Sequence, residues 1–317
     1  MENFTRRNVL GLFGGAAGAA VVGVTALSGP GLLVPGAAAR TAPRRRRRSS
    51  TGIKAVVTAG APLIGMSSPA SAWATQVKAV GPGLAARRIF ADLANGATDQ
   101  IKLVEQAHAA GMLPIVSYKV GGDAAGAASG RFDAVAQQAA AKLASYNLPT
   151  AVAFWHEPYG DLTAAQYIAA SKRLLPFFRR GRLKTGPIFN GWLLDNKQST
   201  FGSFCPNELF ALWDWFGIDT YESGTMDAPG TIKPADRIPK LVTYLKSRGF
   251  ALPIGVGEYN GYSAKSITDA GEALLSTPNV WFGCVWNATG GKGVTLSGDR
   301  LTAFKKTLAD PRAGDPA

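Results

Sequence analysis

Residues 150–181, TAVAFWHEPYGDLTAAQYIAASKRLLPFFRRG, hold the pattern that decides the fold. An apolar, β-rich run predicts a buried strand over 150–157. A turn with Pro and Gly follows, and apolar side chains then recur at helical spacing over 163–181. Thr163 suits the N-cap of this helix, and Gly181 suits its end. The stretch therefore predicts one strand followed by one helix.

The same alternation fills the chain from residue 52 onward. The predicted strands lie at 53–59, 86–93, 113–120, 150–157, 185–193, 215–222, 252–259 and 280–287. The predicted helices lie at 98–111, 132–147, 163–181, 234–250 and 299–310, with weaker candidates at 69–80, 205–214 and 264–276. Thr98 suits an N-cap, while Gly111, Asn147 and Gly249 suit helix ends. We therefore predict an α/β fold, a single (β/α)8 TIM barrel over residues 52–312, with a tail at 313–317.

A doubly wound open sheet is the structural alternative. It requires a phosphate-binding glycine turn after an early strand, and GGDAAGAASG at 121–130 is the nearest match. That segment follows the third predicted strand and lacks the required spacing, so we interpret it as a flexible loop above the barrel.

The positive charge is concentrated at the N-terminus. The formal net charge is +13 over 317 residues, but residues 1–50 alone contain eight Arg and one Glu. The run RRRRR at 44–48 lies in a low-complexity segment outside any recognisable nucleic-acid-binding module. We therefore expect no specific nucleic-acid partner.

The N-terminus has the features of an export signal. Arg6 and Arg7 precede an apolar, glycine-rich stretch, and GAAA at 36–39 offers small residues for cleavage. This resembles a twin-arginine signal over 1–39 followed by an Arg-rich linker over 40–51. We expect export by that machinery and a secreted or envelope-associated protein. A retained membrane anchor is the alternative, because the apolar stretch approaches the roughly 20 residues that span a bilayer.

Cysteine and histidine are scarce. Cys205 and Cys284 allow one disulfide in an exported protein, and the two histidines form no cluster with metal-ligand spacing. We therefore expect no metal and no cofactor.

In a TIM barrel the active site is built at the C-terminal ends of the strands. Strand four ends in His156 and Glu157, and strand seven ends in Glu258. Two carboxylates facing each other across a barrel mouth suit glycoside hydrolysis, in which one carboxyl donates a proton and the other is ionised. Aromatic and polar residues at the neighbouring strand ends would bind sugar rings; they are Asp219, Tyr221, Glu222, Tyr259, Asn260, Trp286 and Asn287.

Four of these strand ends carry a family resemblance. HEPYG at strand four, GIDTY at strand six, GEY at strand seven and Trp286 at strand eight resemble glycoside hydrolase family 26, in the clan of retaining β-glycosidases. The order of elements is similar over roughly 52–310. The resemblance implies a β-mannanase-like enzyme with Glu157 as acid/base, Glu258 as nucleophile, and His156 contacting the sugar or orienting the carboxylates.

The same resemblance assigns supporting roles. Tyr221 would donate a hydrogen bond to the nucleophile, and Trp286 would form the floor of the sugar subsite beside the scissile bond. Arg88, in the second strand, would hold the nucleophile ionised by its charge. Tyr259 and Asn287 would line the substrate site. A retaining mechanism requires carboxyl groups about 5 to 5.5 Å apart.

The sequence departs from the family pattern in two places that concern the substrate. Mannan-cleaving members continue from the HE motif through a glycine into a tryptophan, whereas Gly160 is followed here by Asp161. The third strand ends in Tyr118 and Lys119 where those enzymes have Trp or His. Lys119 could bind a charged sugar group or pair with a neighbouring acid. Mannan, xylan, glucan and a charged polymer all remain open as substrates.

We expect a monomer that acts on a polysaccharide or oligosaccharide. A non-catalytic sugar-binding barrel at the cell envelope is the rival hypothesis, although both carboxylates are retained. A third hypothesis is an envelope or nucleic-acid tether that depends on Arg44 to Arg48.

Overall fold

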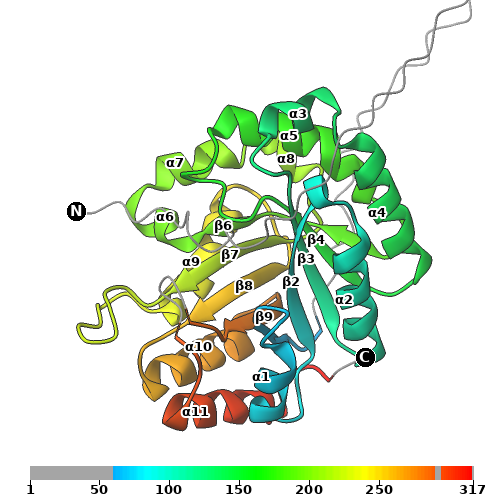
Figure 1. Ribbon diagram of the computed structural model, residues 1–317. Helices are drawn as coiled ribbons and strands as arrows, with labels where there is room; N and C mark the ends of the chain where they lie inside the picture. The colour runs from blue at the N-terminus through cyan, green and yellow to red at the C-terminus, as the bar shows by residue number, and fades with distance from the viewer. Residues whose placement is uncertain (1–59, 290–293, 316–317) are drawn as a thin grey trace, which may run out of the picture. The chain divides into compact units, whose positions relative to one another are not determined.

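A computed structural model of the protein describes residues 60–289 and 294–315. In this part of the chain nine parallel strands form one curled sheet that is surrounded by helices (Figure 1). In chain order the strands are β1 (Leu63–Ser67), β2 (Ala86–Asp92), β3 (Leu113–Lys119), β4 (Thr150–Phe154), β5 (Leu183–Thr185), β6 (Ile188–Asn190), β7 (Phe216–Tyr221), β8 (Ile254–Asn260) and β9 (Val280–Trp286).

The order of the strands shows how the barrel closes. The sheet runs β5-β4-β3-β2-β1-β9-β8-β7-β6, so the first strand pairs with the last. Its two edges, β5 and β6, are the two halves of the fifth barrel strand, which is interrupted at Gly186 and Pro187. The predicted strand at 185–193 covers β6 but only the last residue of β5. β5 pairs with β4 while β6 pairs with β7, and the chain itself joins the two halves. Nine segments therefore fill eight barrel positions, which confirms the predicted TIM barrel.

The start of the barrel differs from the prediction. Residues 53–59, the predicted first strand, lie outside the described residues, as do the predicted signal at 1–39 and linker at 40–51. The position between β2 and β9 is filled by β1, Leu63–Ser67. This shorter run follows Gly60 and contains Gly65, and these glycines made its β character hard to recognise in the sequence.

The helices follow the predicted order with more interruptions. They are α1 (Trp73–Val80), α2 (Thr98–Ala109), α3 (Ala124–Ser129), α4 (Asp133–Ser145), α5 (Ala164–Leu174), α6 (Gly191–Asn196), α7 (Gln198–Phe204), α8 (Asn207–Phe210), α9 (Pro234–Ser247), α10 (Ala264–Ser276) and α11 (Gly298–Leu308), with short 3-10 turns η1 (Leu93–Asn95) and η2 (Leu175–Phe178). Between β6 and β7 the predicted helix at 205–214 is present only as the short α8, and α6 and α7 precede it in the same connection.

The helix ends test the capping predictions. Thr163 caps α5 in a reciprocal capping box with Gln166, as predicted, whereas Ala97 rather than Thr98 occupies the N-cap of α2. The predicted stops Gly111, Asn147, Gly181 and Gly249 all have positive φ.

The predicted flexible loop at 121–130 is wrong. Its alanines form α3, because the Asp123 carboxylate accepts the Gly126 N–H at 2.8 Å and so caps the helix.

The core has two layers. One lies between the sheet and the helices, and the other fills the inside of the barrel with residues of the strands and with Trp215, which directly precedes β7: Ala86, Leu113, Ile115, Ala151, Ala153, Ile188, Trp215, Phe282 and Cys284. This inner layer makes the barrel a packed support instead of a pore, so a ligand site can form only above or below it.

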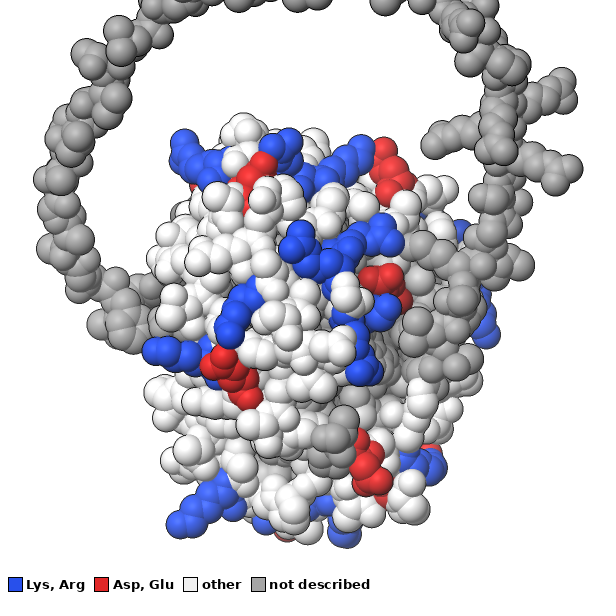
Figure 2. Space-filling view, turned by 90° about the vertical axis from the view of Figure 1, so that its right-hand side faces the viewer, with Lys and Arg blue, Asp and Glu red and all other residues white. Residues whose placement is uncertain are grey.

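Three further observations concern the described residues. Cys205 and Cys284 are both buried and unpaired, so the possible disulfide is absent. No helix in residues 60–289 or 294–315 has the length and apolar character needed to cross a bilayer. On the face in Figure 2, Lys and Arg side chains lie among Asp and Glu instead of forming an uninterrupted basic track.

Candidate active site

The predicted catalytic residues lie at the barrel mouth, which is formed by the C-terminal ends of the strands. Alternation along each strand shows which side chains point inward. Ala86 and Cys284 belong to the inner core, so Arg88 and Phe90 on β2, and Trp286 on β9, face inward as well. By the same spacing from Trp215, residues Asp219 and Tyr221 of β7 face the barrel axis.

Glu258 reaches the mouth through an irregularity in β8. Ile218 of β7 pairs with Val256, but the next residue, Asp219, pairs with Glu258. Gly257 is therefore an extra residue, a β-bulge. Val256 packs in the outer core. If β8 had no bulge, the regular alternation of side chains would therefore direct Glu258 outward as well. The bulge instead places Glu258 beside Asp219, on the inner face.

Residue 257 must be glycine, because the arrangement leaves no room for a side chain there. A Cβ at Gly257 would lie 2.6 Å from Oδ1 of Asp219 and 2.9 Å from Cδ1 of Ile188. The carboxyl group of Asp219 thus occupies the volume that any other residue would need. Asp219 and Glu258 are both only 2% exposed, so neither can move aside into solvent.

The Glu258 carboxylate is held from the neighbouring strand. The Tyr221 hydroxyl donates a short hydrogen bond to Glu258 Oε2. The hydrogen bond that the family resemblance implied for Tyr221 is therefore present.

Glu157 is held by the broken fifth strand. Its backbone N–H donates to the Ile188 carbonyl at 2.8 Å, and Nδ2 of Asn190 donates to its Oε1 at 3.2 Å. Trp155 and Glu157 both have positive φ, 51° and 47°, on either side of His156. Such backbone is costly for residues other than glycine, and it occurs where a site dictates the direction of a side chain.

Arg88 and Cys284 lie beneath the carboxylates. Arg88 is 1% exposed, and its guanidinium makes no hydrogen bond to a described residue. Burial raises the pKa of the Cys284 thiol; the charge of Arg88 opposes this rise, while Asp219 and Glu258 add to it. The Cys284 thiol is therefore within electrostatic range of a buried cation and of two buried carboxylates.

Aromatic rings form one wall of the mouth. The Phe90 ring packs edge-on against His156 at 5.2 Å and against Trp286 at 6.2 Å, between ring centroids. His156 and Trp286 are half-buried, and Phe90 is 37% exposed. Three adjoining rings, partly open to solvent, suit the stacking of a sugar face.

Two predicted substrate residues do not face the mouth. Tyr259 is fully buried in the outer core, because the residue after the inward-pointing Glu258 points outward. Asn287 is also fully buried; its amide donates to Gln76 and Met66, and its oxygen accepts the Leu296 N–H. Both side chains pack within the barrel wall instead of lining the mouth.

Other polar residues near the strand ends are engaged in structure. Asp195 pairs with Arg237 and Lys240, and the Asn260 amide donates to the carbonyls of Trp286 and Val294. Lys119 forms an ion pair with Asp161 at 2.7 Å, the second of the two roles considered for it.

The sequence analysis missed Asn190 and Phe90 as site residues. Both lay inside runs predicted as uninterrupted strand, at 185–193 and 86–93. The Pro187 interruption was the available signal for Asn190, since a central strand does not tolerate proline.

Metal ligands are not grouped in the described part of the chain: no three His, Cys, Asp or Glu side chains within it are placed to hold an ion.

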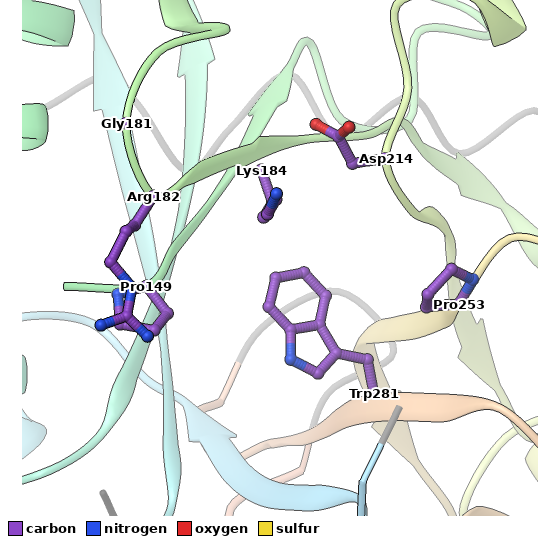
Figure 3. Close-up of a pocket in the computed structure, with 7 residues that line it drawn as sticks. All are labelled: Pro149, Gly181, Arg182, Lys184, Asp214, Pro253 and Trp281. Atoms are coloured by element: carbon purple, nitrogen blue, oxygen red, sulfur yellow. The ribbon is translucent and has the colours of Figure 1, made fainter. Parts of the chain in front are cut away.

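A cavity of about 330 Å³ lies at the opposite end of the barrel, where the strands begin (Figure 3). It is lined by Pro149, Gly181, Arg182, Lys184, Asp214, Pro253 and Trp281, with the Trp281 ring at its centre. Active sites of TIM barrels lie at the other face, so we assign the site to the mouth and not to this cavity.

The comparisons with known proteins bear on the fold. No family model and no curated protein matches this chain. The glycoside hydrolase family 26 domain of an endo-β-mannanase/endo-β-glucanase from Prevotella bryantii superimposes with a TM-score of 0.55 at 12% identity, covering 82% of this chain and 92% of that domain. A mannanase catalytic domain from Streptomyces sp. SirexAA-E gives 0.50 at 13% identity, covering 80% and 85%.

A third solved structure comes from a different glycosidase family. A family 30 subfamily 8 xylanase from Clostridium acetobutylicum gives a TM-score of 0.50 at 12% identity, covering 80% of this chain and 72% of that one. At such identities the likeness shows the fold alone. The chain thus has a TIM barrel similar to the barrels of these glycosidases.

One buried ion pair at the mouth gives a prediction on stability. The loop between β7 and α9 extends from the barrel at the left of Figure 1, and Glu222 at its base accepts from Lys233 and from the Tyr262 N–H. Burial acts to raise the pKa of Glu222, but these donors outweigh burial and hold it below its ordinary value. The stabilisation is therefore present above the ordinary pKa and is lost as the pH falls through the lowered one.

Glu222→Gln should therefore reduce the free energy of unfolding by about 1–3 kcal/mol at pH 7, and the difference from wild type should shrink near pH 3. Urea titrations at both pH values measure this. Glu208→Gln is the control, because Glu208 pairs with Lys172 on the exposed surface and should cost about 0–1 kcal/mol. Equal effects of the two variants at pH 7 would contradict the assignment.

Proposed function

We propose that the protein is a retaining glycoside hydrolase that cleaves a β-linked polysaccharide, with Glu157 as acid/base and Glu258 as nucleophile. The observation that carries the proposal is the bulge at Gly257, which turns a buried glutamate into the mouth and onto the Tyr221 hydroxyl. A barrel that needed only a folded core would gain nothing from a buried carboxylate in this position.

The proposed reaction has two steps. Glu258 attacks the anomeric carbon while Glu157 gives its proton to the departing glycosidic oxygen. A water molecule then loses a proton to Glu157 and attacks the same carbon, which releases Glu258 and retains the configuration. Such a double displacement requires the two carboxyl groups to lie about 5 to 5.5 Å apart.

The surroundings of the two glutamates suit these roles. Tyr221 holds the Glu258 carboxyl group by a hydrogen bond, and the buried cation Arg88 faces inward from β2. Asn190 fixes the orientation of the Glu157 carboxyl group through Oε1, and the left-handed backbone at residue 157 sets its direction. Phe90, His156 and Trp286 would support the sugar whose bond is cleaved.

We propose membership of the clan of retaining β-glycosidases and take β-mannan as the first substrate to assay. Support comes from the strand-end motifs together with mannanases among the proteins of similar fold. Asp161 stands where mannan-cleaving relatives have tryptophan, so xylan and glucan belong in the same panel.

Export as a monomer through the twin-arginine route is proposed from Arg6, Arg7 and the apolar stretch that follows them.

Alanine variants of the two glutamates test the roles. Glu258→Ala should lower kcat on the order of 10⁴-fold or more, because no covalent intermediate can form. Glu157→Ala should lose about 10²- to 10⁴-fold on polysaccharide, which needs the acid, and azide should restore turnover of an activated aryl glycoside. Reducing-end release and product analysis measure both. Wild-type turnover by Glu258→Ala would contradict the mechanism, and sugar binding without hydrolysis by wild type would favour the non-catalytic barrel.

Gly257→Ala tests the bulge itself. The new methyl group would displace Asp219 and shift Glu258, so kcat/KM should fall about 10- to 100-fold. Gly202→Ala is the matched control, because its Cβ would meet only the Tyr244 hydroxyl, at an ordinary 3.6 Å. Activity is compared per folded protein, quantified by circular dichroism. Unchanged kcat/KM in folded Gly257→Ala would show that the position of Glu258 does not depend on the glycine.

A further inference from the structure

Two exposed aromatic side chains flank a lysine beside the acid/base. Tyr159 is 38% exposed and Trp192 is 43% exposed. Lys197 Nζ donates to the Tyr159 hydroxyl at 2.8 Å and lies 5.3 Å and 5.8 Å from the centroids of the Tyr159 and Trp192 rings. We call Tyr159, Trp192 and Lys197 the rim cluster.

The rim cluster is tied to Glu157 through one side chain. Asn190 Oδ1 accepts the Trp192 N–H at 2.9 Å and so begins α6, while its Nδ2 donates to Glu157 at 3.2 Å. Tyr159 follows Glu157 by two residues in the chain. Asn190 therefore contacts both the acid/base and the start of the helix that carries Trp192.

This connection determines which part of a substrate the rim cluster would meet. The acid/base protonates the oxygen of the leaving group, so residues grouped beyond it face the leaving-group sugar. The Phe90 and Trp286 rings contact each other on β2 and β9, across the mouth from β6. The Phe90 and Trp286 rings and the Trp192 ring thus follow strands on opposite sides of the barrel.

Lys197 differs from the other lysines near the mouth in its electrostatic partners. Lys119 pairs with Asp161, Lys233 with Glu222, and Lys240 with Asp195. Within residues 60–289 and 294–315, Lys197 forms no ion pair with a carboxylate, and its ammonium contacts a phenol hydroxyl and two ring faces. Its positive charge is therefore unbalanced at a place where a sugar would stack.

We propose that the rim cluster is a leaving-group subsite for a sugar that carries an anionic substituent, a carboxylate or a sulfate. The rings would stack on the apolar face of the sugar, and the Lys197 ammonium would donate a charge-assisted hydrogen bond to the substituent. This inference rests on the proposed glycosidase function and names the class of substrate, an acidic β-glycan.

The test compares matched oligosaccharides that differ only in charge. In one pair, C6 of the sugar is the carbon of either a carboxylate or, after chemical reduction, a hydroxymethyl group. In a second pair, one member is sulfated and the other is desulfated. We expect wild type to cleave the acidic member of at least one pair with a kcat/KM about tenfold higher or more. The pair that shows the preference identifies the substituent. The preference should shrink with added salt, because Lys197 is exposed.

Variants of Lys197 assign the preference to this side chain. Lys197→Met should bring the ratio of acidic to neutral kcat/KM close to one, while Lys197→Arg should retain most of it. Lys246→Met is the control, because Lys246 is an exposed lysine in the last turn of α9. It should leave the ratio unchanged.

The outcomes separate this inference from the proposed function. Equal cleavage of both members of both pairs by wild type, or an unchanged ratio in Lys197→Met, would overturn the subsite while leaving a glycosidase. No cleavage of any glycan would count against the proposed function instead. In that case calorimetric titration of the same pairs decides the subsite: tighter binding of an acidic member that Lys197→Met abolishes supports it, and equal binding overturns it.

Discussion

The site depends on one extra residue in a strand. Gly257 interrupts the alternation of β8, and only because of this interruption does a glutamate at position 258 face the barrel axis beside Asp219 and accept from Tyr221. The room for the bulge exists because glycine leaves space for the Asp219 carboxylate. The same bulge directs Tyr259 outward, into the core layer between the sheet and the helices. A catalytic orientation and a packing contact thus follow from a single backbone irregularity.

The opposite side of the mouth is built on a second irregularity. The fifth barrel strand breaks at Gly186 and Pro187, and the freed Ile188 carbonyl accepts the Glu157 N–H. Glu157 and Trp155 adopt left-handed backbone there, which the surrounding contacts must stabilise. Each proposed catalytic glutamate therefore sits where regular strand geometry fails, while the regular inner layer below both holds the barrel rigid.

The sequence predicted what depends on periodicity and chain order. The alternation of strand and helix runs predicted the barrel. The strand ends predicted that the site residues lie together at its mouth: Glu157, Glu258, Tyr221 and Trp286. It could not give the direction of side chains beyond a bulge, so Tyr259 was misplaced by one position. The buried position of Asn287 was not predictable, because two of its partners, Met66 and Gln76, come from distant segments of the chain. Asn190 and the rim cluster needed the broken strand, which a continuous β-rich run concealed.

The stereochemistry of cleavage tests the central claim most directly, since it reports whether Glu258 forms a bond to the sugar. Proton NMR of a β-glycan digest in its first minutes, before mutarotation, identifies the anomer that is released. Two displacements at one carbon predict the β-anomer first. The α-anomer as the first product would mean that water attacks directly, and it would contradict the assignment of Glu258 as nucleophile.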